Sequence, residues 1–253
     1  MIKSIFYIEA QARSEPVVKD ALKELVEQMK NEKNVRVKRT KFEEVLEEGN
    51  NYSSVVEVDA EFDDFLDYLL AAIKYGPSAI IVSAPEKLFL DRQEFLKALG
   101  EVARITKDFF EEYNIGYKLI KEGKTRKKVG LSQDEIDDLL EEGALRIKLV
   151  IEAAADSEDE AVKTLLDSFE NDVMINKVKA QDLEKTDGFK GLIGVEVFVY
   201  DAKSVFDLVV KHRPLLIELV EPMEVELDIL DIQDIGVDLA GVFFEASHKL
   251  AHK

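Results

Sequence analysis

The sequence predicts an α+β protein built from two similar halves, each with an antiparallel sheet and helices. The first observation is a repeated phrase: IEAQARSE at 8–15 returns as IEAAADSE at 151–158, with six of eight residues identical. The second is that segments with strand-like and helix-like spacing of apolar residues follow each phrase in the same order. These observations indicate a tandem duplication, because coincidence does not produce a shared order.

Three further pairs of similar segments support the duplication and occur in the same order in both halves. They are Val37-Lys38 with Val178-Lys179, Val56-Glu57-Val58 with Val195-Glu196-Val197, and 74–91 with 211–228. The separation between matched positions decreases steadily along the chain, as short deletions in loops would produce. We therefore expect a first domain at 1–115, a linker at 116–143 and a second domain at 144–253.

Each half begins with a strand that is followed by an amphipathic helix. In the opening phrase Phe6 and Ile8 alternate with Tyr7 on the opposite side, which is the period of a strand with one buried face. Ser14 and Ser157 each precede a glutamate and stand at the position of a helix N-cap. The apolar residues at helical spacing are Val18, Leu22, Leu25 and Val26 in the first half and Val162, Leu165, Leu166 and Phe169 in the second.

The rest of each half contains three more strands and two more helices. The expected segments are a second strand around Val37 and Val178, a third at 55–58 and 194–199, a helix at 63–76 and 201–212, and a fourth strand at 78–84 and 215–221. Pro77 and Pro214 separate that helix from the fourth strand, because proline does not continue a helix. A trailing helix then closes each half, at 92–113 and 235–250.

The order βαββαβ, followed by a trailing helix, resembles the ferredoxin-like superfold in both halves. ACT-type regulatory domains and RNA-recognition modules share that topology. The resemblance implies an antiparallel sheet with strand order 4-1-3-2 and helices on one face. The expected fold class is therefore α+β, with two tandem ferredoxin-like repeats and an additional C-terminal helix in each. A fold of this kind hosts many activities and by itself implies none of them.

The segment between the halves contains the basic stretch KEGKTRKKVG at 121–130 and then a short amphipathic helix. Ser132 and Glu135 have the spacing of a capping box at the start of that helix. Its expected apolar stripe consists of Ile136, Leu139 and Leu140. This helix should pack one face against a neighbouring element.

Composition excludes several classes of protein. The formal net charge of −19 argues against binding of nucleic acid, which requires surplus Lys and Arg to displace phosphate counterions. The chain has no cysteine, so disulfides and thiolate chemistry are excluded. No apolar run is long enough to span a bilayer and no signal peptide is recognised, so we expect a cytoplasmic protein with no membrane contact. Abundant Glu and Lys with little Asn and Gln indicate an archaeal or thermophilic source.

The chemical feature that both halves share is a pair of glutamates on the two central strands. They are Glu9 and Glu57 in the first half, and Glu152 and Glu196 in the second. Each is flanked by core-facing residues, so all four should point away from the helices onto the open face of the sheet. One interpretation is a carboxylate cluster that binds a divalent cation or a basic ligand.

The simpler interpretation of these glutamates is cross-strand ion pairing, and it is the preferred one. Lys38 and Lys179 stand on the neighbouring second strand, where each could neutralise a glutamate. No other constellation of catalytic residues is recognised. The histidines His212, His248 and His252 lack the acidic partner of a zinc-binding helix motif.

We expect a non-enzymatic binding or regulatory protein whose small-molecule ligand lies in a cleft between sheets or between the halves. One alternative is a divalent-metal-dependent hydrolase or transferase that uses the four glutamates. A second alternative is a structural protein or adaptor that forms a homo-oligomer through the faces or edges of its sheets. No cofactor is expected unless the carboxylates bind a divalent cation.

Overall fold

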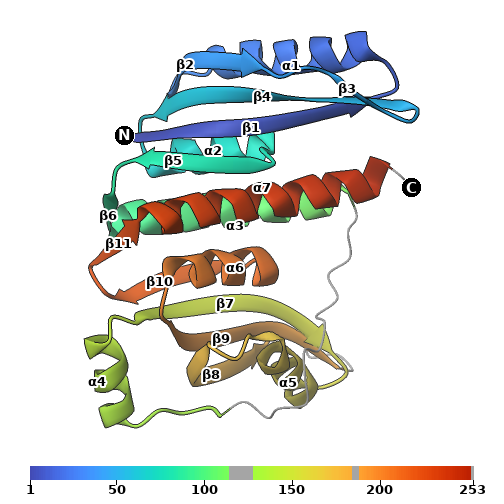
Figure 1. The fold of residues 1–253 in the computed structure, drawn as a ribbon. Coiled ribbons are helices and arrows are strands. Elements are labelled where there is room, and N and C mark those ends of the chain that lie inside the picture. The colour runs from blue at the N-terminus through green and yellow to red at the C-terminus, as the bar shows by residue number, and fades with distance from the viewer. Residues whose placement is uncertain (114–127, 184–187, 252–253) are drawn as a thin grey trace. The chain divides into compact units, whose positions relative to one another are not determined.

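The computed structural model describes residues 1–113, 128–183 and 188–251 (Figure 1). It confirms the α+β class with antiparallel sheets. Contacts divide the chain into two compact units: unit 1 contains Met1–Phe89 and Glu226–Lys253, and unit 2 contains Leu90–Val225. Most of the basic stretch 121–130, the side chain of His248 and the whole of His252 lie outside the described residues.

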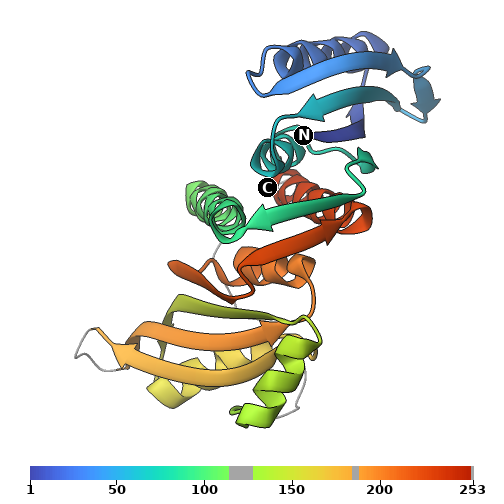
Figure 2. The same cartoon turned by 90° about the vertical axis from the view of Figure 1, so that its left-hand side faces the viewer.

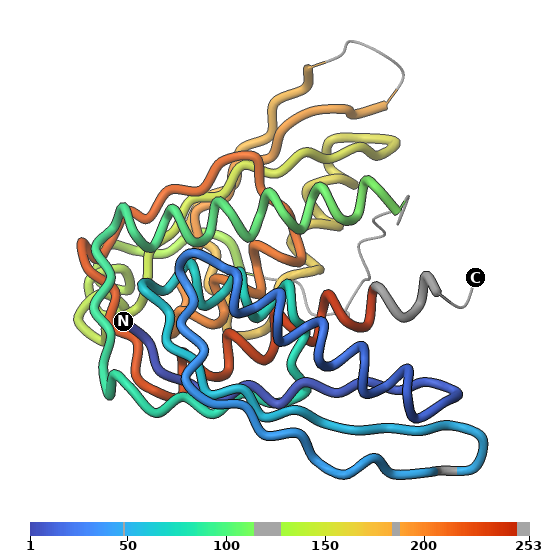
Figure 3. Tube along the Cα trace, turned by 90° about the horizontal axis from the view of Figure 1, so that it is seen from above, coloured from blue at the N-terminus to red at the C-terminus, as the bar shows by residue number. Residues whose placement is uncertain are grey.

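Unit 1 is built on a sheet whose neighbouring strands are antiparallel. Its strands are β1 (Ile2–Ala12), β2 (Val35–Phe42), β3 (Leu46–Glu48), β4 (Asn51–Phe62) and β5 (Ala79–Ala84). The order is β2-β4-β1-β5, with β3 paired to β4. The helices of this unit are α1 (Glu15–Lys30), α2 (Phe65–Tyr75) and α7 (Ile229–Ala251). Helix α1 runs beside β1 and β4 (Figure 3).

Alternation along β1 and β4 places the core of unit 1 on one face of its sheet. Phe6 of β1 and Phe62 of β4 are fully buried, while the residues between the buried positions face away. Tyr68 of α2 packs on both rings, and the three ring centroids lie between 5.3 and 6.0 Å apart. Offset and edge-on contacts of this kind add to the stabilisation from buried apolar area.

Unit 2 has a second antiparallel sheet of order β10-β7-β9-β8. Its strands are β7 (Leu145–Ala155), β8 (Met174–Asp182), β9 (Phe189–Val199) and β10 (Leu216–Glu221). Its helices are α3 (Arg92–Glu112), α4 (Gln133–Glu141), α5 (Glu158–Ser168) and α6 (Ala202–His212). In both sheets the first and third strands of the expected order are central neighbours.

Two short strands contain the points at which the chain passes from one unit to the other. They are β6 (Lys87–Asp91) and β11 (Glu224–Asp228), and they pair in a two-stranded sheet. The chain therefore connects the units twice, once before α3 and once before α7. The expected linker 116–143 does not separate the units, since its described residues belong to unit 2.

The trailing helices lie in the opposite units from those expected. The sequence places 92–113 with the first half and 235–250 with the second, whereas α3 packs in unit 2 and α7 packs in unit 1. The compact units consequently differ from the expected domains 1–115 and 144–253. Amphipathic periodicity shows that a helix has an apolar face, but it does not show which sheet that face covers.

Specific contacts fix each trailing helix in its unit. In unit 1, the Tyr68 hydroxyl donates a hydrogen bond to the carbonyl of Ile232 in α7 over 2.9 Å. In unit 2, Phe95 of α3 contacts Phe206 of α6 edge-on, with ring centroids 5.9 Å apart. Both contacts are buried, so they hold the helices through packing as well as through hydrogen bonding.

Helix α4 covers part of the open face of the unit 2 sheet (Figure 2). Its predicted capping box is confirmed, because Ser132 and Glu135 each bond the other's backbone N–H. Ile136 and Leu139 of the predicted stripe are buried against Phe198 of β9. None of the helices in the described parts of the chain is long and apolar enough to cross a membrane.

Candidate functional site

Strand alternation places all four glutamates singled out by the sequence on the open faces of the two sheets, and of these Glu196 is buried. Glu9 in β1 is exposed on the face of the sheet that turns away from α1 and α2, and Glu152 in β7 is exposed in the same way. Glu57 in β4 is half-buried, and its carboxylate lies 3.3 Å from the Lys41 ammonium. Lys38, which was expected to neutralise Glu57, instead lies 3.0 Å from Glu61.

Strand register shows that Glu57 and Glu196 are not at equivalent positions in the two units. Glu57 lies opposite Tyr7, whereas Glu196 lies opposite Lys148. The repeated octapeptide matches Lys148 with Ile5, two residues from Tyr7. The two Val-Glu-Val segments are therefore displaced by two residues from each other in strand register. Glu152 lies opposite Leu192, so it is not the cross-strand partner of Glu196.

Glu196 is a buried structural carboxylate. Asn176 donates a hydrogen bond to it over 2.5 Å and Arg146 donates another over 2.9 Å. Burial by itself would raise the pKa of Glu196, but the bonds from Asn176 and Arg146 outweigh burial and hold the pKa below its ordinary value. The Asn176 side chain also accepts a bond from the Leu131 N–H, so this cluster ties the segment before α4 to the sheet.

The open face of unit 1 carries a ladder of ion pairs. The Glu61 carboxylate forms ion pairs with the Lys38 ammonium at 3.0 Å, and with the Lys3 ammonium and the Arg36 guanidinium at 3.5 Å. The hydrogen bond from Lys38 is the main cause that lowers the pKa of Glu61. Within the described residues, no group of three or more His, Cys, Asp and Glu side chains is placed to hold a metal ion.

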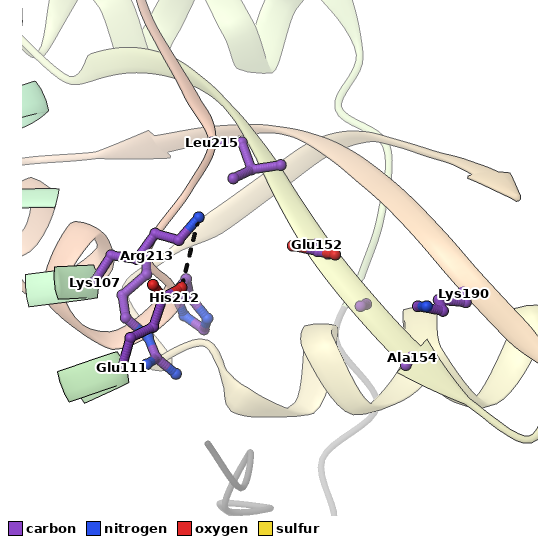
Figure 4. A pocket seen from close by; sticks show the side chains of 9 residues that line it. Lys107, Glu111, Glu152, Ala154, Lys190, His212, Arg213 and Leu215 are labelled. Atoms are coloured by element: carbon purple, nitrogen blue, oxygen red, sulfur yellow. Dashed lines mark ion pairs between the residues drawn. The ribbon is translucent and has the colours of Figure 1, made fainter. Parts of the chain in front are cut away.

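A cavity of about 310 Å³ in unit 2 contains one of the four glutamates, Glu152 (Figure 4). It is formed by the last turns of α3, the end of β7, the start of β9 and the segment after α6. Its lining residues are Lys107, Glu111, Glu152, Ala153, Ala154, Lys190, His212, Arg213 and Leu215. The cavity belongs entirely to unit 2.

The cavity has charged groups of both signs. Figure 4 shows Lys107, Glu111 and Arg213 on one side, Lys190 on the other, and Glu152 between them. Lys107 and Glu111 are neighbours on α3 and form an ion pair at 3.8 Å. Glu152 has no ion-pair partner among the residues that the structure describes. Charges of both signs around a small volume favour a polar ligand over an apolar one.

His212 at the end of α6 forms part of the cavity wall and is only 3% exposed. Its ring packs against Phe169 with centroids 4.8 Å apart. Burial is the main cause that lowers the pKa of His212 to about 3, and the positive charges of Lys211 and Arg213 lower it further. The imidazole is therefore neutral at physiological pH.

Arg213 holds a backbone conformation that disfavours arginine. Its φ of 46° and ψ of 57° lie in the left-handed region, and it is the one non-glycine residue with positive φ in the described chain. The similar segment of unit 1 has Gly76 at this position, with φ of 51°. Both residues end a helix through a backbone bond, but only glycine does so without a steric cost.

Sequence reasoning missed every cavity residue except Glu152. The cavity forms where α3 meets α6 and β7, and the sequence assigns α3 to the other half. A usable signal was present in the matched segments KYGP and KHRP, because Arg213 replaces a glycine immediately after a helix. A non-glycine residue at a helix C-cap that favours glycine marks a position where another requirement overrides backbone preference.

The fold and the cavity define an α+β protein with a small cavity, lined in part by charged side chains, in one of its two compact units. The chain belongs to the MJ0538 family, whose model matches residues 3–253. It is similar to the "Uncharacterized protein MJ0538" of Methanocaldococcus jannaschii, with 34% identity over 259 aligned residues that cover 98% of each chain. This archaeal relative fits the source that the composition indicates. No solved structure matches the chain.

Proposed function

We propose that this chain is a non-enzymatic binding or regulatory protein and that the unit 2 cavity is its small-molecule site. The observation that supports this is the cavity of about 310 Å³ with charged side chains from α3, β7, β9 and the segment after α6. Small-molecule sites begin at about this size and combine a few convergent polar groups with an apolar wall. Here Ala153 and Leu215 provide the apolar part.

Binding is favoured over catalysis by the state of His212. A general base works best when its pKa lies near the operating pH, and the pKa of His212 is lowered to about 3. A neutral imidazole buried in the wall orients a ligand by hydrogen bonding but takes up a proton poorly. The cavity therefore has the groups for recognition without an effective histidine base.

The tandem duplication is also part of this proposal. Its support is that both units have a four-strand core of the same order, in which the first and third strands are central. Under this proposal the repeats are 1–115 and 144–253 along the chain, and each contributes its trailing helix to the other's compact unit. The unit 2 cavity, with Lys107 and Glu111 on α3, would then contain residues from both repeats.

The test of this function is a thermal-shift screen of the full chain with small metabolites and with Mg²⁺, Mn²⁺ and Ca²⁺. A metabolite that binds the folded state raises the melting temperature in proportion to the logarithm of its concentration. Ala154→Tyr, which fills the cavity from an exposed strand position, should abolish that shift. The matched control is Gln11→Tyr, at the corresponding exposed position of β1.

The alternatives give different results in the same screen. Stabilisation by a divalent metal that disappears in Glu9→Gln and Glu152→Gln would support a metal-dependent hydrolase or transferase. A melting temperature that depends on protein concentration, with no response to any small molecule, would support a structural homo-oligomer. Either of these outcomes, in place of a metabolite shift, would contradict the proposed function.

A further inference from the structure

We propose that the unit 2 cavity binds a small molecule with an oxyanion at one end and an ammonium group at the other, held by Arg213 and Glu152 respectively. This inference rests on the proposed function and specifies its ligand. The oxyanion is a phosphate or a carboxylate, since both offer a pair of oxygens that a guanidinium recognises with two parallel hydrogen bonds.

The first support is the conformation of Arg213. In unit 1 the same helix end has Gly76, whose left-handed conformation carries no side-chain clash. In unit 2 an arginine takes that conformation, and its guanidinium carbon lies 4.9 Å from the centroid of the Phe110 ring. Contact with the ring restrains the guanidinium, which prepares its N–H groups to bind two oxygens of an anion.

The second support is the position of the cations relative to Glu152. Lys107 and Arg213 lie on the same side of the cavity as Glu111, which pairs with Lys107, so that side has one more cation than carboxylate and favours a negative group (Figure 4). Glu152 lies between that side and Lys190. A simple anion would be repelled by the Glu152 carboxylate, whereas an ammonium at the far end of the ligand would form an ion pair with it.

The third support is the size and neutrality of the remaining wall. A volume of about 310 Å³ accommodates a small metabolite rather than a nucleotide with several phosphates. His212 is neutral, so it adds no charge to the site and can contribute a hydrogen bond. Ala153 and Leu215 suit the short apolar spacer that would join the two charged ends.

The test uses four probes that separate the two ends of the ligand. Phosphoethanolamine and β-alanine carry an ammonium together with a phosphate or a carboxylate, and they distinguish the two oxyanions from each other. Inorganic phosphate carries the anion alone, and ethanolamine carries the ammonium alone. Isothermal titration of the full chain should show that at least one of the two-ended probes binds more tightly than both single-ended probes.

Arg213→Gly is the decisive variant because it removes the cation and also removes the steric cost of a side chain in the left-handed backbone conformation. Its melting temperature should equal or exceed that of the unchanged protein, since glycine suits the left-handed position. Its affinity for the two-ended probe should fall about tenfold or more, the usual effect of losing a charged hydrogen-bond pair. Arg213→Asn is a second variant, since asparagine also adopts the left-handed conformation. Lys179→Gln is the control for loss of a positive charge elsewhere in unit 2.

Glu152→Gln tests the other end of the ligand. It should weaken the two-ended probe and strengthen inorganic phosphate, because the repulsive carboxylate becomes neutral. Equal affinity of Arg213→Gly, Arg213→Asn and the unchanged protein for the two-ended probe would overturn this inference. If another metabolite shows a shift that Ala154→Tyr abolishes and Arg213→Gly does not, the inference fails while the proposed function stands. If no metabolite binds at all, the proposed function itself fails.

Discussion

At the scale of single residues, unit 2 contains two buried titratable groups that the fold keeps in opposite states. Glu196 stays ionised because Asn176 and Arg146 donate hydrogen bonds to it, and its lowered pKa means that its contribution to stability is present above the ordinary value of 4.5 and is lost as pH falls below it. His212 stays neutral because burial disfavours its charged form. The charge of a buried group therefore depends on whether hydrogen bonds to its charged form outweigh the cost of burial, as they do for Glu196.

His212 should make folding sensitive to acid. Its pKa is about 3 in the folded protein and 6.5 when exposed, so protons bind the unfolded state first as pH falls below 6.5. Between pH 7 and pH 5 the folded state should lose about 2 kcal/mol from this group, and the loss should continue until about pH 3. His212→Phe keeps an aromatic ring against Phe169 and removes the titration.

The measurement is the free energy of unfolding in denaturant at pH 7 and pH 5 for both proteins. The drop in stability between the two pH values should be smaller in His212→Phe than in the unchanged protein. Identical drops would show that His212 titrates normally and that its burial has no energetic consequence.

At the scale of elements, the position of α7 depends on one close approach to α2. A Cβ added at Gly236 would lie 2.1 Å from the Tyr68 hydroxyl oxygen and 2.7 Å from the adjoining ring carbon. Tyr68 is fully buried and donates a hydrogen bond to Ile232 of α7, so it cannot move aside without losing that bond. Burial also raises the pKa of Tyr68 far above its ordinary value, which keeps the hydroxyl protonated as a donor.

Gly236→Ala should therefore destabilise the protein although alanine favours helices. The expected loss is about 1–3 kcal/mol from overpacking, measured by denaturant unfolding. Gly241→Ala in the same helix is the matched control, because nothing lies within 4 Å of its added Cβ. That change should be neutral or stabilising by up to about 1 kcal/mol.

The double variant Gly236→Ala with Tyr68→Phe identifies the cause. Removing the hydroxyl removes the closest clash, so the double variant should lose less stability than the sum of the two single changes. Strict additivity would show that the Tyr68 hydroxyl is not what limits residue size at position 236.

At the scale of the whole molecule, the two compact units each contain a helix that the sequence order assigns to the other half. The chain passes between the units at β6 and again at β11. Each trailing helix should therefore stabilise the half of the chain that is distant from it in sequence: α7 stabilises the first half, and α3 stabilises the second. This follows from which unit buries each helix, irrespective of how the units are oriented.

Substitutions that leave a cavity beside α7 or α3 should therefore destabilise the unit that buries that helix. Ile235→Ala in α7 should weaken amide protection in β5 and α2 of unit 1, and Phe95→Ala in α3 should weaken it in β10 and α6 of unit 2. Hydrogen exchange resolved by segment is the measurement, and each variant is the control for the other. Loss of protection in the half that neighbours the substituted residue along the sequence would contradict the observed division into units.

Particular residues show how far sequence alone could predict this site. Alternation placed all four glutamates on the open faces, and Ser132 and Glu135 identified the start of α4. Sequence similarity misaligned Glu57 with Glu196, because matching letters carry no information about strand register. The predicted partner of Glu57 was also wrong: Lys41 pairs with Glu57, and Lys38 reaches Glu61, since long lysine side chains reach more than one carboxylate.

By itself the sequence determined most of the local structure: the main strands and helices of each half and which of their faces are apolar. These properties depend on neighbours along the chain, and a few residues suffice to specify them. The sequence did not identify the short strands β3 and β6, and α7 begins at Ile229 rather than at 235. Only the tertiary structure decided that α3 lies in unit 2 and α7 in unit 1. It alone also decided that α4 covers Phe198 and that Arg213 and Glu152 line the same cavity. Apolar faces of similar length fit either sheet, so the choice rests on shape complementarity across distant residues, such as the space that Gly236 leaves for Tyr68.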